Sequence, residues 1–142
     1  MYYSVTFENS DHVKKNTWSD WRLIPSRPPM LKPPEIEVNY ITIPGRKKGP
    51  IALENPSYGN MEGEWTFLAD DEALSRIYMF EALKKFIHGQ FLKIILEEDP
   101  FHYYEGFFYV GEPQSGMGTT AYTISYVVAP VRFKLDGTED GV

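Results

Sequence analysis

The residues best suited to chemistry gather in one short segment around Asp99. Three carboxylates, Glu97, Glu98 and Asp99, are closely followed by His102, and carboxylate and imidazole groups are common ligands of divalent metal ions. The segment is predicted to be a strand end and a turn, where successive side chains point in different directions. No second cluster of ligating residues in the sequence completes the set. We therefore predict an acidic turn here, and no metal site.

Three other carboxylates raise the alternative of glycoside hydrolysis, which uses two acidic side chains on either side of the bond that is cleaved. The candidates are Glu62, Glu64 and Glu105. Any acidic β-protein contains such residues, and nothing in the spacing of these three marks a cleft. We predict that the chain has no catalytic residues.

Nucleophilic catalysis by serine is also weakly indicated. A nucleophile elbow places its serine on a sharp turn between a strand and a helix, and none of the serines has that context. The serines considered are Ser4, Ser26, Ser57, Ser75, Ser115 and Ser125. The sequence does not place His12, His88 or His102 to activate any of them. We predict that the protein is not an enzyme and binds no cofactor.

Two loops invite a binding interpretation. Gly116-Met117-Gly118 is rich in glycine, but no helix follows it to supply the N-terminal amides that hold phosphate. We predict a flexible hairpin tip there. Arg46, Lys47 and Lys48 form the one basic cluster of the sequence, for which a solvated turn and a contact with acidic protein or nucleic acid both stay open.

Length and composition limit the class of protein. The 142 residues fit one domain, and the absence of cysteine excludes disulfides and thiolate metal sites. A net charge of −6 argues against a general phosphate-binding surface. No apolar run is long enough to span a bilayer, and the first ten residues lack the pattern of a secretory signal. We expect one domain over residues 1–135, a flexible acidic tail over 136–142, and no membrane association.

Alternating apolar and polar residues predict the strands that position these side chains. The clearest strand covers 122–128, and others are expected at 2–8, 36–42, 64–69, 91–96 and 101–109, with loops at 9–15 and 55–63. One helix is predicted over 72–88, ending at Gly89, which can adopt positive φ. About seven strands without a regular βαβ alternation indicate a mainly β (α+β) fold. We expect an antiparallel β-sandwich or split barrel with one packed α-helix.

Residues 16–34 are predicted to form an extended arm. This segment contains prolines that exclude a helix or a central strand, namely Pro25, Pro28, Pro29, Pro33 and Pro34. Trp18 and Trp21 are expected to dock the arm onto an apolar surface. That surface is either the core of the same chain or a neighbouring subunit.

The predicted strand at 101–109 is unusual because it has aromatic rings on both faces. Phe101, Tyr103, Phe107 and Tyr109 alternate with Tyr104 and Phe108, and alternate side chains of a strand point to opposite faces. One face can meet the core. The other is covered by the helix, by the arm or by another chain, or else forms an exposed platform for sugar or single-stranded nucleic acid. The acidic net charge disfavours nucleic acid.

Several short segments, taken together, resemble the N-terminal domain of the distal tail proteins, which are the baseplate hub proteins of siphophages. The matching pieces are Asn16-Thr17-x-x-x-Asp20-Trp21-x-Leu23-Ile24-Pro25, the run from Arg27-Pro28 to Pro34, Ile43-Pro44-Gly45 before a basic turn and Gly49, Ile87-His88-Gly89, Asp99-Pro100, Tyr103-Tyr104-x-Gly106 and Ala129-Pro130. Their order and spacing over residues 16–130 carry the resemblance.

The resemblance implies a fold related to tail-tube proteins and supplies no catalytic residues. It implies a homo-hexameric ring between the tail-tube protein above and a tail-associated hub or fibre protein below. Double-stranded DNA would pass through the ring without specific binding. The protein would be made in the host bacterial cytoplasm and would reside at the tail tip of the virion. Two alternatives stay open, a tail-tube subunit and a monomeric carbohydrate-binding β-sandwich module.

Overall fold

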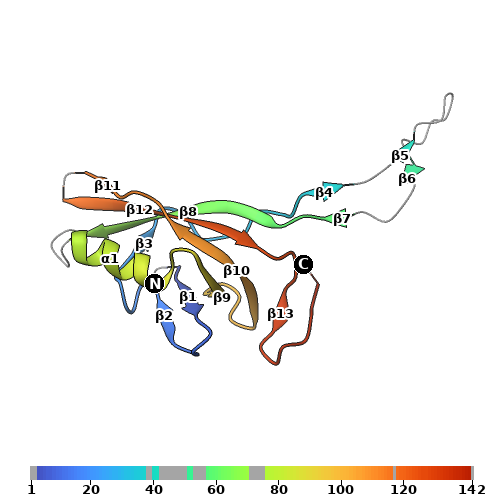
Figure 1. The fold of residues 1–142 in the computed structure, drawn as a ribbon, viewed down its shortest axis with the longest axis horizontal. Helices are drawn as coiled ribbons and strands as arrows, with labels where there is room; N and C mark the ends of the chain where they lie inside the picture. Colours follow the sequence, from blue (N-terminus) through green and yellow to red (C-terminus); the bar gives the residue numbers. More distant parts are fainter. Residues whose placement is uncertain are drawn as a thin grey trace.

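The computed structural model describes residues 3–37, 40–41, 51–52, 57–70, 76–116 and 118–141. These residues form strands of very different length and one helix (Figure 1). The strands are β1 (Val5–Glu8), β2 (Lys14–Asn16), β3 (Ile24–Pro25), β4 (Ile36–Glu37), β5 (Tyr40–Ile41), β6 (Ile51–Ala52), β7 (Ser57–Tyr58), β8 (Met61–Asp70), β9 (Gln90–Leu96), β10 (His102–Val110), β11 (Gln114–Ser115), β12 (Thr119–Val128) and β13 (Phe133–Lys134), and the helix is α1 (Arg76–Phe86).

One nine-stranded sheet forms the body of the described chain, and all of its strand pairs are antiparallel. The strand order is β2-β1-β9-β10-β12-β8-β3, with β11 beside β12 and β13 beside β10. The predicted mainly β fold with one packed helix is confirmed, and the open sheet is consistent with a β-sandwich or split barrel. The short strands β2 and β3 lie in segments predicted as a loop and as the arm, and the predicted strand at 36–42 lies outside this sheet, where β4 and β5 pair with β7 and β6.

The core lies on one face of this sheet, which we call the inner face. Along β12, Tyr122, Ile124, Tyr126 and Val128 are buried, whereas the residues between them are partly exposed. Buried residues of neighbouring strands join the same cluster, among them Phe7, Phe67, Leu92, Ile94 and Phe108. The alternation that predicted the strands is therefore the alternation of burial.

Helix α1 covers the inner face with one stripe of residues. Met79, Leu83 and Ile87 are all buried in the core cluster, at the spacing that puts side chains on one side of a helix. The helix ends at Phe86, two residues before the predicted end, and Gly89 follows with φ of 72°. The Gly89 amide donates to the carbonyl of Phe108, at 2.7 Å, which joins the helix end to β10. No helix among the described residues is long and apolar enough to cross a membrane.

The proline-rich arm packs on its own chain. Trp21 and Leu23 are buried in the core, and β3 pairs with the edge of β8. Further along, the Trp65 indole donates to the carbonyl of Met30 at 2.8 Å. Of the two surfaces considered for the arm, the described contacts support the core of the same chain.

The hydroxyl group of Tyr126 should hold the arm against the sheet and contribute measurably to stability. It accepts a hydrogen bond from the Lys32 amide at 2.9 Å and lies 3.4 Å from the carbonyl of Met30. We expect Tyr126→Phe to lower the free energy of unfolding by about 0.5–1.5 kcal/mol, because the amide loses its partner, and to speed chymotryptic cleavage of the arm after Leu31. Urea denaturation and limited proteolysis measure the two effects. Tyr109→Phe, on an exposed side chain, is the control and should change stability by less than about 0.5 kcal/mol; equal effects would contradict this role.

The prediction of loops at 9–15 and 55–63 was partly wrong. Residues 14–16 form β2, 57–58 form β7, and 61–63 belong to β8. Gly63 was interpreted as a loop residue, but it sits inside the strand because a Cβ there would meet the Tyr126 hydroxyl and lie 2.8 Å from Tyr126 Cζ. A glycine in a strand often marks such a close approach.

The C-terminal residues 132–141 form a hairpin. Within it, the Lys134 amide donates to the Thr138 carbonyl at 2.8 Å and the Asp140 amide donates to the Arg132 carbonyl at 2.7 Å. Its strand is β13, which follows the break at Ala129-Pro130. The flexibility expected of residues 136–142 stays a prediction.

Candidate interaction surfaces

The two faces of β10 differ sharply in exposure, and this difference shows which of its aromatic rings face the core. Phe108 is 0% exposed and packs edge-on against Phe7, with ring centroids 5.3 Å apart. Phe107, its neighbour, is 45% exposed. Tyr109 is exposed on the same side as Phe107, and Tyr104 is partly buried against the core. One face of the strand thus serves the core, and the other is the outer face of the sheet.

We call Phe91, Phe107 and Tyr109 the outer aromatic patch. Phe91 of β9 lies directly opposite Phe107 in the strand register, and their ring centroids are 5.3 Å apart at 65°. The His88 ring meets Tyr109 edge-on at 5.9 Å. The rings are tilted and not coplanar, unlike a flat platform on which a sugar or base would stack. This geometry is better suited to contact with another protein surface.

The candidate glycosidase carboxylates are separated in the sheet. Glu62 and Glu64 are exposed on the outer face of β8, opposite Val127 and Ser125 of β12. Glu105 lies beyond β12, on β10, directly opposite Lys93 of β9 in the strand register. Strand β12 therefore separates Glu105 from Glu62 and Glu64.

The acidic turn and His102 do come together, but as a hydrogen-bonded network. His102 lies 2.8 Å from Asp99 and 2.7 Å from Asp140, the latter a residue that sequence reasoning did not connect with it. Glu97 accepts a hydrogen bond from the Ser4 amide at 2.7 Å. Glu98 and Asp99 border a groove of about 400 Å³ that also contacts the proline-rich arm. Among the described residues, no three histidine or carboxylate side chains are placed so that they could hold a metal ion together.

The other histidines have structural contacts. His88 Nδ1 accepts a hydrogen bond from the Val110 amide at 3.0 Å, and His12 lies 3.8 Å from Glu8. Ser4 accepts from the Asn16 side chain at 3.1 Å. These contacts connect each histidine to strand or carboxylate groups, and they give no nucleophile–base pair. Ser75 and the side chain of Ser57 lie outside the described residues.

The two loops are described in part. Gly116 donates to the Thr119 carbonyl at 2.7 Å, and Gly118 has φ of 80°, so the glycines turn the chain between β11 and β12. This confirms a hairpin tip, although Met117 lies outside the described residues. The basic turn of Arg46, Lys47 and Lys48 also lies outside them.

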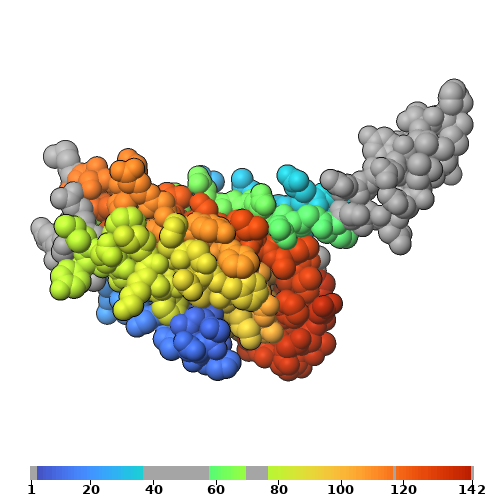
Figure 2. Space-filling view, viewed as in Figure 1, coloured from blue at the N-terminus to red at the C-terminus, as the bar shows by residue number. Residues whose placement is uncertain are grey.

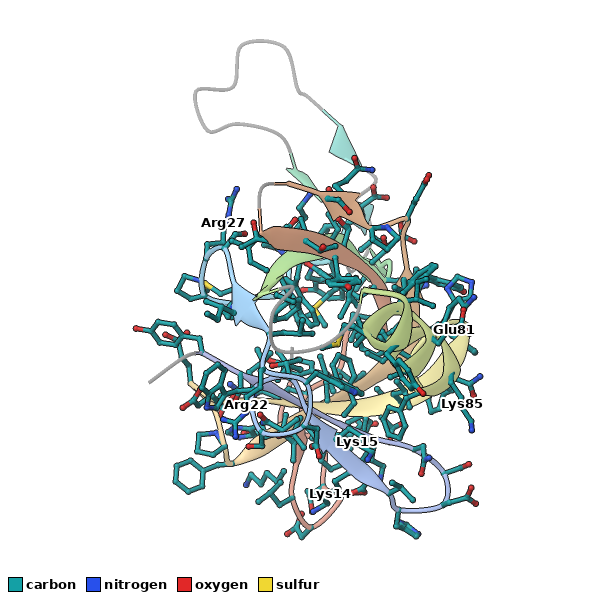
Figure 3. All side chains as sticks on the ribbon, turned by 90° about the vertical axis from the view of Figure 1, so that its left-hand side faces the viewer. Lys14, Lys15, Arg22, Arg27, Glu81 and Lys85 are labelled. Carbon is teal, nitrogen blue, oxygen red and sulfur yellow. The ribbon has the colours of Figure 1, made fainter. Side chains whose placement is uncertain are left out.

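Two further surfaces were not anticipated. On α1, Ile77 and Tyr78 are each 75% exposed, and Glu81 and Lys85 project from the outer side of the helix (Figure 3). Figure 3 also labels Lys14 and Lys15, which are neighbours on β2, together with Arg22 and Arg27 of the arm.

The second surface is a two-stranded ladder that leaves the sheet. β4 pairs with β7, and β5 with β6 still further from the core (Figure 1). The cross-strand partners Ile36 and Tyr58 are 56% and 52% exposed. An isolated pair of strands is only marginally stable in water, so we expect this ladder to gain contacts from another chain.

Comparison with known proteins supports the fold. No protein-family model matches the sequence, and no curated protein matches it. Among solved structures, the chain is similar to the SPP1 Dit protein, described as a paradigm of the hub adsorption apparatus in phages that infect Gram-positive hosts. The TM-score is 0.63 at 15% identity, over 92% of this chain and 52% of that one. The resemblance to distal tail proteins is thus confirmed at the level of fold, and the chain spans about half the length of this structure.

Proposed function

We propose that this chain is a structural virion protein: a distal tail, or baseplate hub, subunit whose hexameric ring joins the tail tube to the tail tip. The observation that carries the proposal is the fold, since 92% of the chain matches a solved hub protein at a TM-score of 0.63. The partners are identical copies in the ring, the tail-tube protein above, and a hub or fibre protein below. The protein is made in the host bacterial cytoplasm, functions at the virion tail tip, and is not an enzyme.

The exposed apolar surfaces support assembly with other chains. The outer aromatic patch and the projecting ladder both leave large apolar side chains accessible to solvent. A closed ring presents the same two lateral surfaces on every subunit, so neighbours can cover such surfaces without leaving any subunit different from the rest.

The charge of the chain supports the passage of DNA. Each chain carries a net charge of −6, and Glu62 and Glu64 are exposed on β8. If the channel receives part of this charge, it repels the phosphate backbone and DNA passes without being held. Mapping the residues that line the channel of an assembled ring tests this point. A channel lined mainly by lysine and arginine would contradict it.

Assembly of the purified protein is the decisive experiment. We expect hexameric rings in negative-stain images and in native mass spectra of the protein mixed with the tail-tube protein of the same virus, because some rings form only on the tail. Antibody labelling of the native particle should mark the tail tip. Filaments formed by the chain alone would indicate a tail-tube subunit. A monomer that ignores the tube protein but is retained on a polysaccharide column would indicate a carbohydrate-binding module.

A further inference from the structure

The C-terminal hairpin, residues 132–141, lies against the sheet like a strap. β13 pairs with β10 beyond the point where β12 ends, with His102 opposite Lys134 and Tyr103 opposite Phe133. The rings of Tyr103 and Phe133 stack, with centroids 5.2 Å apart and planes at 14°. Figure 2 shows these last residues, in red, packed beside β10. The strap therefore covers both an edge of β10 and one side of the Tyr103 ring.

His102 ties this strap to the body of the protein. Its Nδ1 lies 2.8 Å from Asp99 Oδ1, at the turn before β10, and its Nε2 lies 2.7 Å from Asp140 Oδ2, in the strap. An ionised carboxylate only accepts hydrogen bonds, and a neutral imidazole has one N–H group and one lone pair. Neutral His102 could therefore donate to one carboxylate but would face the other with a lone pair. Both contacts together require the doubly protonated imidazolium.

We infer that residues 132–141 form a pH-sensitive strap, closed on β10 by imidazolium His102 between Asp99 and Asp140, and loosened when His102 loses its second proton. Opening uncovers the β10 edge at His102 and the ring of Tyr103, which are new surfaces for a partner. This inference rests on the hydrogen-bond geometry and does not depend on the proposed role in a phage tail.

We call the contacts of His102 with Asp99 and Asp140 the latch. The charged groups around the latch favour the protonated form of His102. The hydrogen bond to Asp99 raises the pKa of His102 above 6.5, aided by Asp140 and opposed by burial and by the positive charge of Arg132. The hydrogen bond to His102 lowers the pKa of Asp140 below 3.8, with help from Lys134 and Arg132. Arg132 Nη2 also lies 3.3 Å from Asp140 Oδ2. The Arg132–Asp140 contact does not depend on the charge of His102. We therefore expect deprotonation of His102 to make separation of the strap from β10 more frequent, while the closed strap still forms.

The signs of these shifts define a pH window. A raised pKa means that the closed strap holds its proton more tightly, so the contribution of His102 is complete below 6.5 and is lost as pH rises through its raised pKa. A lowered pKa means that the contribution of Asp140 is complete above 3.8 and is lost as pH falls through its lowered pKa. The latch is therefore tightest between pH 3.8 and pH 6.5, where both contributions are complete.

Hydrogen exchange of the full chain tests the strap directly. The readout is the amides of Tyr103 and Phe133, the residues paired between β10 and β13, followed by NMR after correction for the intrinsic effect of pH on exchange. We expect the opening constant to rise by up to about tenfold per pH unit between 6.5 and the pKa of His102, and then to level off. The titration of the His102 ring in the same spectra should show that pKa above 6.5.

Matched variants separate the latch from general effects of pH. In Asp140→Asn, the amide can donate to a neutral imidazole, so the His102 pKa should move toward 6.5 and the rise in opening should shrink. His12→Asn is the control: its side chain is 82% exposed, and its φ of 62° suits asparagine. This control should keep the wild-type pH dependence. A His102 that titrates at or below 6.5, or an Asp140→Asn variant with the wild-type profile, would overturn the inference.

Discussion

Phe108→Ala is expected to lower the free energy of unfolding by about 3–5 kcal/mol, the range for truncating a buried aromatic side chain. Phe108 is fully buried where several rings meet. It contacts Phe7 edge-on at 5.3 Å and stacks near Trp65 at 6.3 Å. Removing it leaves a cavity between β1, β8 and β10 that these large rings cannot fill without moving the strands. Urea denaturation followed by tryptophan fluorescence measures the loss.

Phe107→Ala is the matched control, because it removes the same side chain one position earlier on the same strand. Phe107 is 45% exposed on the outer face and contacts Phe91. We expect a change of less than about 1 kcal/mol. Since this variant keeps its fold, it also isolates the outer aromatic patch. A loss of ring assembly in Phe107→Ala would place the patch in a subunit contact. Similar losses of stability in the two variants would contradict the assignment of the two faces.

The sequence alone could not decide which of these two rings is buried. An alternation of apolar and polar residues reveals the buried face of a strand, as on β12, where Tyr122, Ile124 and Tyr126 are buried. On β10 both faces carry rings, so the local pattern does not show which alternate set of residues points to the core. The pairing of β10 with β9 and β12 determines which set is buried, and this pairing involves residues distant in sequence.

The prediction of β8 as a shorter strand had a similar cause. Gly63 and the residues before it favour a loop by their local preference. In the structure β12 pairs with all of β8, from Thr119 opposite Asp70 to Val128 opposite Met61. These long-range hydrogen bonds outweigh local propensity, as tertiary context commonly does in sheets.

The candidate surfaces were predictable only in part. The excess of aromatic residues on one hairpin indicated a surface for contact, and the absence of a nucleophile–base pattern argued against catalysis. The pairing of His102 with Asp140 joins residues 38 positions apart, and no periodic signal in the sequence reports such a contact. The projecting ladder also depends on where β4 and β7 leave the sheet, which their alternation does not specify.

Gly106→Ala is expected to be comparably destabilising, for a different reason. Gly106 lies in the middle of β10, opposite Leu92 on one side and Val128 on the other. A Cβ there would meet the Val127 carbonyl and lie 2.7 Å from Val128 Cα. These are backbone atoms of β12, which cannot rotate away as a side-chain end could. We expect a loss at or above the upper end of the roughly 1–3 kcal/mol typical of overpacking.

Gly111→Ala provides the matched comparison for this effect in urea denaturation. Its added Cβ would lie 3.6 Å from the Thr123 carbonyl, an ordinary van der Waals distance. We expect stability to stay within about 0.5 kcal/mol of the wild type. If Gly106→Ala were equally mild, β10 and β12 could not approach as closely as they do here. The register that turns Phe108 inward and Phe107 outward would then be wrong, because the same strand pairing that crowds Gly106 fixes the orientation of both rings.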